Sequence, residues 1–409
     1  MKIVYLTDDY PPHTTGGAAR VVYSLAKKMK ELGHEVCVIT TVRNRSEEGI
    51  SSENGIFIYR LVSKYHERWR AWLSIYNFKV VGRIAAILRD IGPDVVHAHN
   101  IHYHLSYHAL KQARNFAQKV FFTAHDVMSF AYTKFWPREN DCNLINYKMT
   151  FWQNLKIAKK RFNPFRNILI KKYLGYCDKI FAVSGALAEA LRQNGIKNAV
   201  TIYNGFDAVN IFLPNPEELS GFKTRHNLNG KKVMLLAGRV SHEKGAYLMI
   251  EILPEIKKIV PEAVLFFAGV KEEEAVKFAD YAKKFGVESC LRLSGWLDEG
   301  GMSMAYLSSD MVLAPSLIFD SFPTTNLEAA LYKKPVIATC FGGSKEFIID
   351  GKTGFVVNPY DKNALASKII DLLSDKNKAD SFGQAAFERL KNDFSLSRQA
   401  QILLQYYKQ

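Results

Sequence analysis

The sequence has 409 residues, more than one hydrophobic core usually organises, and this length suits two domains of about 150–200 residues each. Hydrophobic residues make up 48% and charged residues 23%, which excludes a disordered or fibrous chain, and no run approaches the roughly 18 apolar residues that cross a bilayer. The net charge of +15 is concentrated in residues 1–210, which hold 30 Lys and Arg against 16 Asp and Glu, whereas residues 211–409 hold 25 against 24. The first half is therefore expected to meet a large anionic partner, either nucleic acid or a phospholipid surface.

The start of the chain and its cysteines predict a cytoplasmic protein. The N-terminus runs directly into a strand-like KIVYL, with no apolar signal region. Five cysteines are scattered without a C-x-x-C pair: Cys37, Cys142, Cys177, Cys290 and Cys340. This pattern is typical of a reducing compartment and argues against structural zinc or a disulfide framework.

In the first half, short apolar runs rich in Val and Ile predict strands buried on both faces of a parallel sheet. They begin at Lys2, Val36, Ile56, Asp94, Lys119, Lys179 and Ala199. Segments with helical spacing lie between them. In Arg20–Leu32, for example, apolar residues recur every three or four positions and Gly33 follows as a helix terminator.

A second set of strand-like runs begins at Lys231 and continues through VLFFAGV, CLRLSGW, MVLAP, PVIAT and TGFVV. The predicted domains are 1–207 and 230–393, with a linker at 208–229 and a C-terminal helix at 394–409 that packs back on the first domain. Alternating strands and helices in both halves predict an α/β fold with two doubly wound domains facing a central cleft. Ligands of such sheets bind at the carboxyl ends of the strands.

One stretch, at about 130–176, is longer than a crossover helix requires. Between Lys134 and Lys179 it holds eleven Lys and Arg against three acids. Aromatic residues are interleaved with these charges: Phe135, Trp136, Tyr147, Phe151, Trp152, Phe162 and Phe165. A similar mixture fills Lys64–Arg89. Such residues predict either a membrane-facing surface or a solvated insertion whose aromatic rings pack on the core.

Three loops carry candidate binding residues. Gly16 and Gly17 follow the first strand and would let backbone N–H groups approach an anion, although a simple tight turn explains two glycines equally well. In LAGRVSHEKG, Arg239 and Lys244 follow the first strand of the second domain and could bind a diphosphate, or could be solvated surface cations.

The third loop, DMVLAPSLIFDSFPTTNLEA, is the most informative. A buried strand leads to Asp320 in a loop, and the following helix carries Glu328, so the two carboxylates could bind hydroxyls of one ligand. The helix N-terminus would offer N–H groups to a phosphate or sugar oxygen. The residues assigned to this junction are Ser321, Phe322, Pro323 and Thr324, together with Thr325. In the alternative interpretation Asp320 or Ser321 is only the helix cap and Glu328 is solvated.

Taken in order, these motifs resemble the family 4 retaining glycosyltransferases. The resemblance rests on the GG loop, T-A-H-D at Thr123–Asp126, V-S at Val183–Ser184, Y-N-G at Tyr203–Gly205, G-R-x-x-x-x-K-G at Gly238–Gly245, A-P-S…D-S-F-P-x-x-x-L-E-A and the run Gly342–Phe355. Each motif is weak alone, but their order extends over nearly the whole chain. The resemblance implies a GT-B fold and transfer of a sugar from a nucleotide-diphosphate sugar to a glycan or lipid-linked acceptor, in cell-envelope or exopolysaccharide synthesis.

The resemblance also implies residue roles. Arg239 and Lys244 match the diphosphate-binding cations, and Glu328 matches the second Glu of E-x(7)-E, which holds the ribose. Asp320 replaces the first Glu, which contacts the transferred sugar, and is one methylene shorter. His125 matches the histidine near the reacting centre. Gly16 and Gly17 match the loop that approaches the donor.

No metal or other cofactor is expected, because the chain contains no D-x-D motif. Metal binding is not expected at His97, His99, His102, His104 and His108, because they lack nearby Cys or carboxylate partners, and some of them are expected to line the acceptor side instead. The expected partners are a nucleotide sugar, the acceptor and an anionic membrane surface at the inner face. No nucleic acid is expected, since no recognition signature accompanies the basic residues.

Three other functions remain compatible with parts of the sequence. A nucleotide-sugar epimerase would share the two-domain fold, and a non-catalytic subunit supporting an active partner would tolerate Asp320. A protein that binds an anionic polymer would show steeply salt-dependent affinity.

Overall fold

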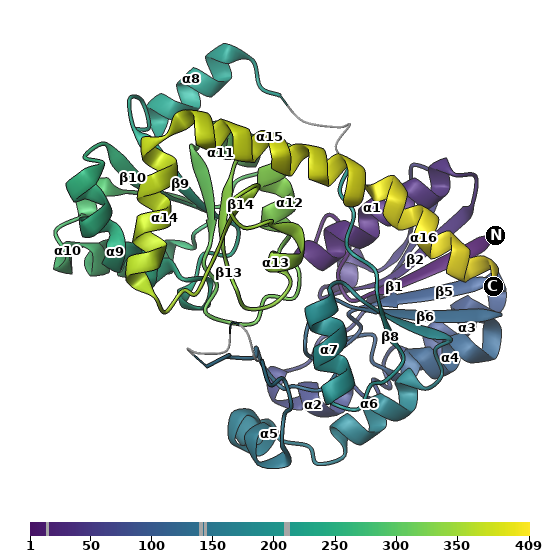
Figure 1. Ribbon diagram of the computed structural model, residues 1–409. Helices are drawn as coiled ribbons and strands as arrows, with labels where there is room; N and C mark the ends of the chain where they lie inside the picture. Colours follow the sequence, from purple (N-terminus) through teal and green to yellow (C-terminus); the bar gives the residue numbers. More distant parts are fainter. Residues whose placement is uncertain (14–15, 139–141, 143–144, 208–212) are drawn as a thin grey trace. The chain divides into compact units, whose positions relative to one another are not determined.

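The computed structural model describes residues 1–13, 16–138, 142, 145–207 and 213–409. These residues form two compact units. Unit 1 comprises 1–135, 146–207 and 394–409, and unit 2 comprises 136–145 and 208–393. Each unit contains one sheet flanked by helices (Figure 1).

The sheet of unit 1 has the order β3-β4-β2-β1-β5-β6-β7-β8, and every pair is parallel except β3–β4. Its strands are β1 (Lys2–Thr7), β2 (Glu35–Val42), β3 (Gly49–Glu53), β4 (Ile56–Val62), β5 (Val95–His99), β6 (Lys119–Ala124), β7 (Lys179–Ala182) and β8 (Ala199–Thr201). All of the strands expected here from apolar runs are present. The antiparallel edge strand β3 was not predicted because all five of its residues are exposed and carry no apolar pattern.

The helices of unit 1 connect these strands, and short 3-10 turns lie at Arg45–Glu47, Glu67–Trp69 and Lys159–Arg161. The helices are α1 (Gly17–Glu31), α2 (Arg70–Leu73), α3 (Val81–Ile91), α4 (His108–Phe116), α5 (Phe151–Ala158), α6 (Arg166–Leu174), α7 (Gly185–Gln193) and α16 (Leu396–Lys408). The C-terminal helix α16 packs against α1 and buries Leu403 and Tyr407 in the same core as Val22 and Leu25 (Figure 1).

The sheet of unit 2 is wholly parallel, with the order β11-β10-β9-β12-β13-β14. Its strands are β9 (Lys232–Ala237), β10 (Ala263–Ala268), β11 (Leu291–Ser294), β12 (Met311–Ala314), β13 (Val336–Thr339) and β14 (Gly354–Val357). Its helices are α8 (Pro216–Arg225), α9 (Ala246–Ile259), α10 (Glu272–Lys284), α11 (Glu299–Leu307), α12 (Thr324–Leu331), α13 (Ser344–Phe347), α14 (Lys362–Ser374) and α15 (Lys376–Asp393), with 3-10 turns at His242–Lys244 and Glu288–Cys290. Two Rossmann-like α/β domains are thus confirmed.

Two segments differ from the organisation expected from the sequence. The stretch 208–229 contains a helix, α8, which begins at a capping box formed by Asn215 and Glu218 with Pro216 in its first turn. The sequence shows no periodic apolar pattern in this helix, because Phe222 is its only buried residue. The short stretch 136–145, expected within the first domain, belongs to unit 2.

Candidate functional site

The candidate donor site of unit 2 is built from three loops that follow adjacent parallel strands. These loops are Gly238–Gly245 after β9, 315–323 after β12 and 340–343 after β13. Because parallel strands all end at the same edge of their sheet, the three loops lie at the edge where α/β proteins bind ligands.

The first two loops touch through their backbones. Leu317 N–H donates to the Glu243 carbonyl at 2.9 Å. Gly245 has a φ of +83°, and a Cβ at this position would lie 2.4 Å from the Pro315 carbonyl oxygen. The second glycine of G-R-x-x-x-x-K-G is therefore required by both its backbone conformation and the close approach of the loops.

The predicted residues Lys244 and Asp320 meet at this junction. Lys244 Nζ forms an ion pair with Asp320 Oδ2, and their side chains are 33% and 15% exposed. Ser316 Oγ donates to the same carboxylate oxygen at 3.3 Å. Arg239 lies on the Lys244 loop and is exposed, and within the described residues its side chain forms no hydrogen bond or ion pair. The arrangement offers one free and one paired cation to an anionic ligand.

The backbone of Asp320 is fixed by the third loop. Its N–H donates to the Phe341 carbonyl at 3.3 Å, and its carbonyl accepts from Gly343 N–H at 2.9 Å. Gly342 has a φ of +99°, and a Cβ there would lie 2.0 Å from the Asp320 carbonyl oxygen. Any side chain at 342 would displace the acidic loop.

The helix α12 begins just after Asp320. Pro323 is its N-cap, with extended backbone, and no side chain caps the helix. The alternative in which Asp320 or Ser321 serves only as a cap is therefore wrong. Ser321 and Phe322 are each 6% exposed, and Thr324 is the first helical residue. Asn326 N–H donates to the Pro323 carbonyl at 3.2 Å, and among the described residues no side chain caps the N–H groups of Thr324 and Thr325, which suit an oxygen ligand.

Glu328, on α12, is partly buried and oriented by an aromatic pair. Tyr306 Oη donates to Glu328 Oε2 at 2.6 Å. Tyr306 is 2% exposed and stacks on Tyr332, with ring centroids 5.3 Å apart. The carboxylate is thus held rather than freely solvated, although nothing in the sequence indicated Tyr306 as its partner.

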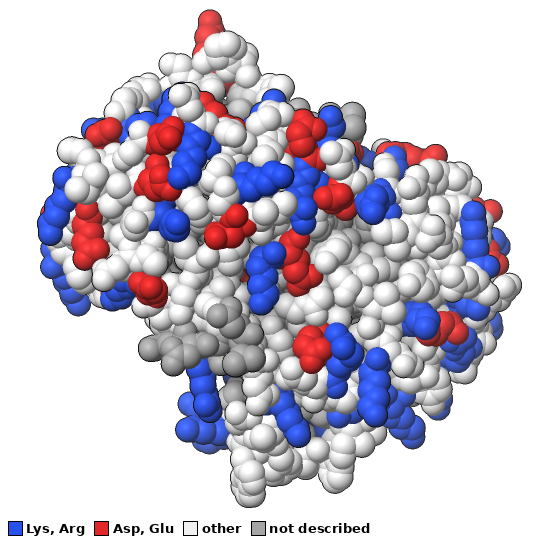
Figure 2. Space-filling view, viewed as in Figure 1, with Lys and Arg blue, Asp and Glu red and all other residues white. Residues whose placement is uncertain are grey.

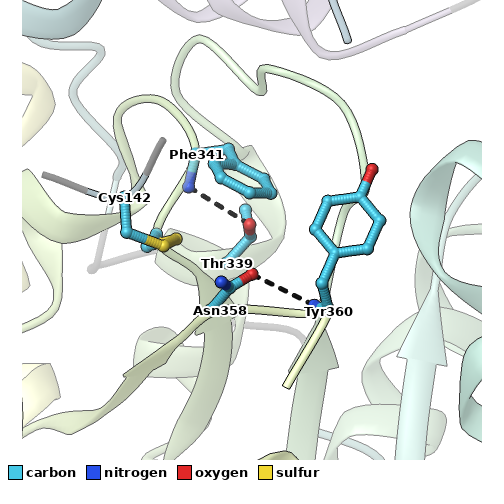
Figure 3. The surroundings of a disulfide bond; sticks show 6 residues. Cys142, Thr339, Phe341, Asn358 and Tyr360 are labelled. Carbon is cyan, nitrogen blue, oxygen red and sulfur yellow. Dashed lines mark hydrogen bonds between the residues drawn. A yellow bond between two sulfur atoms is a disulfide. The ribbon is translucent and has the colours of Figure 1, made fainter. Parts of the chain in front are cut away.

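A disulfide joins Cys142 to Cys340 beside the third loop (Figure 3), with a Cα–Cα distance of 5.4 Å. The expectation of a chain without disulfides was wrong, because the two residues are 198 positions apart and only the fold brings them together. Next to Cys340, Phe341 N–H donates to Thr339 Oγ1 at 3.1 Å, and the Phe341 ring lies 5.9 Å from that of Tyr360.

The segment containing Cys142 also reaches the first loop. The Trp136 ring lies 5.7 Å from the ring of His242, which is in the loop containing Arg239 and Lys244. Part of the basic aromatic insertion therefore belongs to the surroundings of the candidate donor site, a role not foreseen from the sequence.

The remaining predicted residues belong to unit 1. Gly16 is the N-cap of α1, with extended backbone, and Gly17 is the first residue of that helix. His125 follows β6, and its Nε2 lies 3.0 Å from Nδ1 of His99. Burial lowers the pKa of His125 to about 3, so its ring is neutral at physiological pH.

The five histidines 97–108 are divided among separate contacts. His97 bonds Tyr407 and Thr123 at 2.6 and 2.7 Å, and His104 bonds Ser63 at 3.0 Å. Burial lowers the pKa of His97 and His104 to about 3. Among the described residues, no three His, Cys, Asp or Glu side chains gather as a possible metal site. No helix in the described part of the chain is long and apolar enough to span a membrane.

Two family comparisons match consecutive parts of the chain. Residues 15–209 match the family described as Glycosyltransferase Family 4, and residues 222–389 match Glycosyl transferases group 1. A glycogen synthase of Mycobacterium tuberculosis is 24% identical over 426 aligned positions, covering 100% of this chain and 94% of that protein. A GDP-mannose-dependent phosphatidylinositol monomannoside mannosyltransferase of Mycolicibacterium smegmatis is 27% identical over 42% of this chain and 47% of its own.

Solved structures share the fold at low identity. Sucrose-phosphate synthase from Thermosynechococcus elongatus superposes with a TM-score of 0.77 at 18% identity, covering 100% of this chain and 98% of that chain. The Anabaena protein HepE, solved in complex with UDP and glucose, gives a TM-score of 0.71 at 19% identity, covering 100% and 99%.

Proposed function

Because the chain belongs to the family 4 glycosyltransferases of GT-B type, we propose that it transfers a sugar from a nucleoside-diphosphate sugar to a glycan or lipid-linked acceptor, with retention at the anomeric carbon and without a metal. The observation that carries this proposal is the junction of three loops where Lys244 and Asp320 meet beside Arg239. Complexes of HepE with UDP and with UDP-glucose support the choice of a nucleoside diphosphate.

Each residue of the junction has a proposed role. Arg239 and Lys244 bind the diphosphate, and Glu328, oriented by Tyr306, binds the ribose hydroxyls. Asp320 binds hydroxyls of the transferred sugar, and Lys244 would then share its charge between Asp320 and the diphosphate. In unit 1, His125 contacts the transferred sugar, while Gly16 and Gly17 open the N-terminus of α1 to the donor.

The proposed chemistry relies on electrostatic stabilisation. The acceptor hydroxyl attacks the anomeric carbon from the face of the leaving group, the bond from that carbon to the diphosphate oxygen breaks, and the hydroxyl proton passes to the departing diphosphate. Arg239 and Lys244 stabilise the negative charge that grows on this leaving group. A neutral His125 offers a hydrogen bond without adding charge near the reacting centre.

The first test replaces Lys244 by Met, with Lys352→Met, an exposed lysine on a turn of the same unit, as the matched control. Loss of a cation that stabilises the leaving group should lower turnover by roughly 10²–10³-fold. Donor binding is measured beforehand by thermal shift with UDP, GDP, ADP and CMP, each with and without EDTA. Transfer by Lys244→Met at the parent rate, or a nucleotide shift abolished by EDTA, contradicts the assignment.

The same assay tests the alternative of a non-catalytic subunit, which Asp320 favours because it is shorter than the family's Glu. A purified single chain that binds a nucleotide but neither transfers nor hydrolyses any sugar conjugate would support that alternative. Recovery of transfer in Asp320→Glu would identify the missing methylene as the cause.

We also propose that unit 1 contacts an anionic lipid surface at the inner face of the membrane. Four exposed aromatic residues of the insertion and α2, named here the aromatic surface, are Trp72, Phe151, Trp152 and Phe165, with exposed fractions of 49%, 54%, 73% and 61%. Asn163 Nδ2 joins the insertion to the Ala71 carbonyl at 3.2 Å. Figure 2 shows Lys and Arg on this part of unit 1, with few acids among them. Tyr147, by contrast, is buried, so the insertion is partly a packed structure.

Vesicle flotation tests this contact. The parent protein should float with vesicles containing anionic phospholipid and not with purely zwitterionic ones, because basic side chains supply the attraction and aromatic rings insert at the interface. The double variant Trp152→Ser/Phe165→Ser should lose most of the bound fraction. Trp296→Ser, which removes an equally exposed tryptophan from unit 2, should not. Equal flotation of both variants would refute the proposed surface.

A further inference from the structure

Unit 1 holds a second group of polar side chains at the carboxyl ends of β5 and β6, beyond His125. Asn100 joins the two loops there, since its Nδ2 donates to Asp126 Oδ2 and its Oδ1 accepts from His125 N–H, both at 3.2 Å. Its φ is +44°, an uncommon conformation for a residue other than glycine. Strained backbone of this kind is concentrated at functional sites, where the surrounding structure maintains it.

The loop after β5 is further fixed by Asp8 at the end of β1. The Asp8 carboxylate accepts three backbone N–H groups at 2.6–2.8 Å, from Tyr103, His104 and Leu105. These three hydrogen bonds to the Asp8 carboxylate fix the backbone of the loop after β5. The edge is therefore organised before any ligand binds.

Two arginines from distant parts of the sequence reach this edge. Arg70 is the first residue of α2, and its guanidinium lies 3.7 Å from the centroid of the Tyr103 ring. Arg166 is the first residue of α6, is 3% exposed, and donates to the Met128 carbonyl and to Asn167 Oδ1. Arg166 comes from the basic aromatic insertion, so the insertion contributes a side chain to the acceptor side of unit 1.

The Arg70 guanidinium is short of acceptors, whereas both Nη atoms of Arg166 already donate hydrogen bonds. Arg70 Nη2 is buried and has no hydrogen-bond partner, and neither arginine lies within 4.0 Å of a carboxylate oxygen in the described portion of the chain. Buried charges in proteins are normally paired and hydrogen-bonded, because an unpaired one loses its hydration without compensation. An incoming ligand with anionic oxygens would supply the acceptor that Arg70 Nη2 lacks.

The carboxylates of this edge are already engaged by other partners. Asp126, whose side chain is 35% exposed, is the carboxylate that both arginines influence. It already accepts from Met128 N–H at 2.9 Å and from Asn100, and His102 Nε2 lies 3.6 Å from it. The pKa of His102 is well below its ordinary value because of burial and the two nearby arginines, so this ring adds no charge. The two carboxylates of this edge, Asp8 and Asp126, are thus held by backbone N–H groups, and among the described residues neither lies within 4.0 Å of an arginine of this pair.

We propose that Arg70 binds an oxyanion, phosphoryl or carboxylate, carried by the acceptor, and that the charge of the nearby Arg166 adds to the attraction. This inference rests on the proposed function and narrows its acceptor to anionic sugars or lipid phosphates. The planar guanidinium fork matches the paired oxygens of both groups, which an ammonium group would not do. Tyr103, which is 39% exposed, lies at the same edge and offers part of its ring to a sugar.

Thermal-shift titrations with four probes test the proposal: glucose 6-phosphate, glucuronate, geranyl phosphate and neutral glucose. All are run with the donor site saturated by the nucleoside diphosphate that stabilises the protein, so that Arg239 and Lys244 do not capture the probe. The variants are Arg70→Gln, Arg70→Lys and, as the matched control, Arg68→Gln, which removes an exposed arginine two residues away.

At least one anionic probe should stabilise the parent protein and Arg68→Gln more than glucose does. Its Kd should rise at least tenfold in Arg70→Gln and by less in Arg70→Lys, which keeps the charge but loses the fork. The identity of the probe that binds shows whether the anionic group of the acceptor is a sugar phosphate, a carboxylate or a lipid phosphate.

Unchanged anion affinity in Arg70→Gln, equal stabilisation by glucose, or no response to any anionic probe would overturn the inference. The change in melting temperature on adding nucleotide, recorded on the same samples, distinguishes failure of the donor-site proposal from failure of the acceptor proposal. An intact nucleotide shift without anion binding removes only the acceptor assignment, and a missing nucleotide shift counts against the donor site itself. If no nucleotide stabilises the chain, the probes are titrated against Lys244→Met, where anion binding at the donor cations is weakened.

Discussion

At the residue scale, the candidate donor site depends on two glycines that allow backbones to approach each other. Gly245 faces the Pro315 carbonyl and Gly342 faces the Asp320 carbonyl, each with a positive φ. These positions carry no chemistry of their own. They determine how near Lys244 comes to Asp320, so the spacing of the motif reflects packing as well as ligand binding.

Gly245→Ala should therefore destabilise unit 2 by more than strain alone. Gly286→Ala provides the matched control, because Gly286 also has a positive φ, +65°, but has open space around it. We expect roughly 1 kcal/mol of strain in the control and a larger loss in Gly245→Ala, whose Cβ would displace the Pro315 loop. Urea unfolding of both variants measures the difference, and nucleotide affinity should fall only in Gly245→Ala. Equal losses of stability would contradict the close-approach argument.

Some residues of the candidate sites could be predicted from the sequence, and others could not. Lys244, Asp320 and Glu328 could be identified because they occupy a motif after a predicted strand. Tyr306 could not, since it reaches Glu328 from α11 and is an ordinary apolar position in the sequence. Arg70 and Arg166 lie 96 residues apart and were visible only as members of basic runs.

At the element scale, the segment 136–145 of the insertion belongs to unit 2. It is attached at two described points, the Trp136 ring on His242 and the Cys142–Cys340 disulfide. Both attachment points lie on loops of the candidate donor site. Removing the disulfide should therefore affect stability and donor binding together.

Cys142→Ser should lower the melting temperature of the oxidised protein. In the loop-entropy description, a cross-link between positions separated by 198 residues contributes about 5 kcal/mol at most. Reductant should lower the parent's melting temperature to that of the variant and leave the variant unchanged. Cys37→Ser, which alters an unpaired cysteine of unit 1, serves as the control. A parent protein insensitive to reductant, with five titratable thiols, would show that the pair does not form.

At the scale of the whole molecule, buried histidines of unit 1 make the stability of the protein sensitive to acid. Unit 1 holds four nearly inaccessible histidines, at 97, 99, 102 and 104, and burial lowers the pKa of each. The folded chain keeps these rings neutral, whereas the unfolded chain protonates them below about pH 6.5. Their contribution to stability is therefore present above pH 6.5 and is lost progressively as the pH falls below it, down to about pH 3 for His97 and His104.

The expected loss is about 1.4 kcal/mol per pH unit for each of these rings. Asp8 offsets the loss from about one histidine below pH 6. Burial raises its pKa to about 6, so the folded state binds a proton before the unfolded state does. Urea unfolding at pH 7.0, 6.0 and 5.0, followed by tryptophan fluorescence, should show a steep fall in the free energy of unfolding. His104→Gln should reduce the slope of that fall by the contribution of one histidine, about 1.4 kcal/mol per pH unit. Stability that is constant over this range would contradict the burial of these side chains.

The sequence by itself determined the local elements and their order. Continuous Val- and Ile-rich runs predicted all but one strand of the two sheets, because strands buried on both faces must be apolar throughout. The exception, β3, is exposed and has no such pattern. Motif order along the chain was enough to identify the family, the loops that carry Arg239, Lys244 and Asp320, and the helix that carries Glu328.

Only the tertiary structure decided which distant residues meet. The Lys244–Asp320 ion pair spans 76 residues, and the Cys142–Cys340 disulfide spans 198. The convergence of Arg70 and Arg166 on the edge that holds Asp126 depends on how two separate segments return to the same sheet. Periodicity along the chain reports burial and local conformation, whereas these contacts depend on strand order and loop paths, which no local pattern encodes.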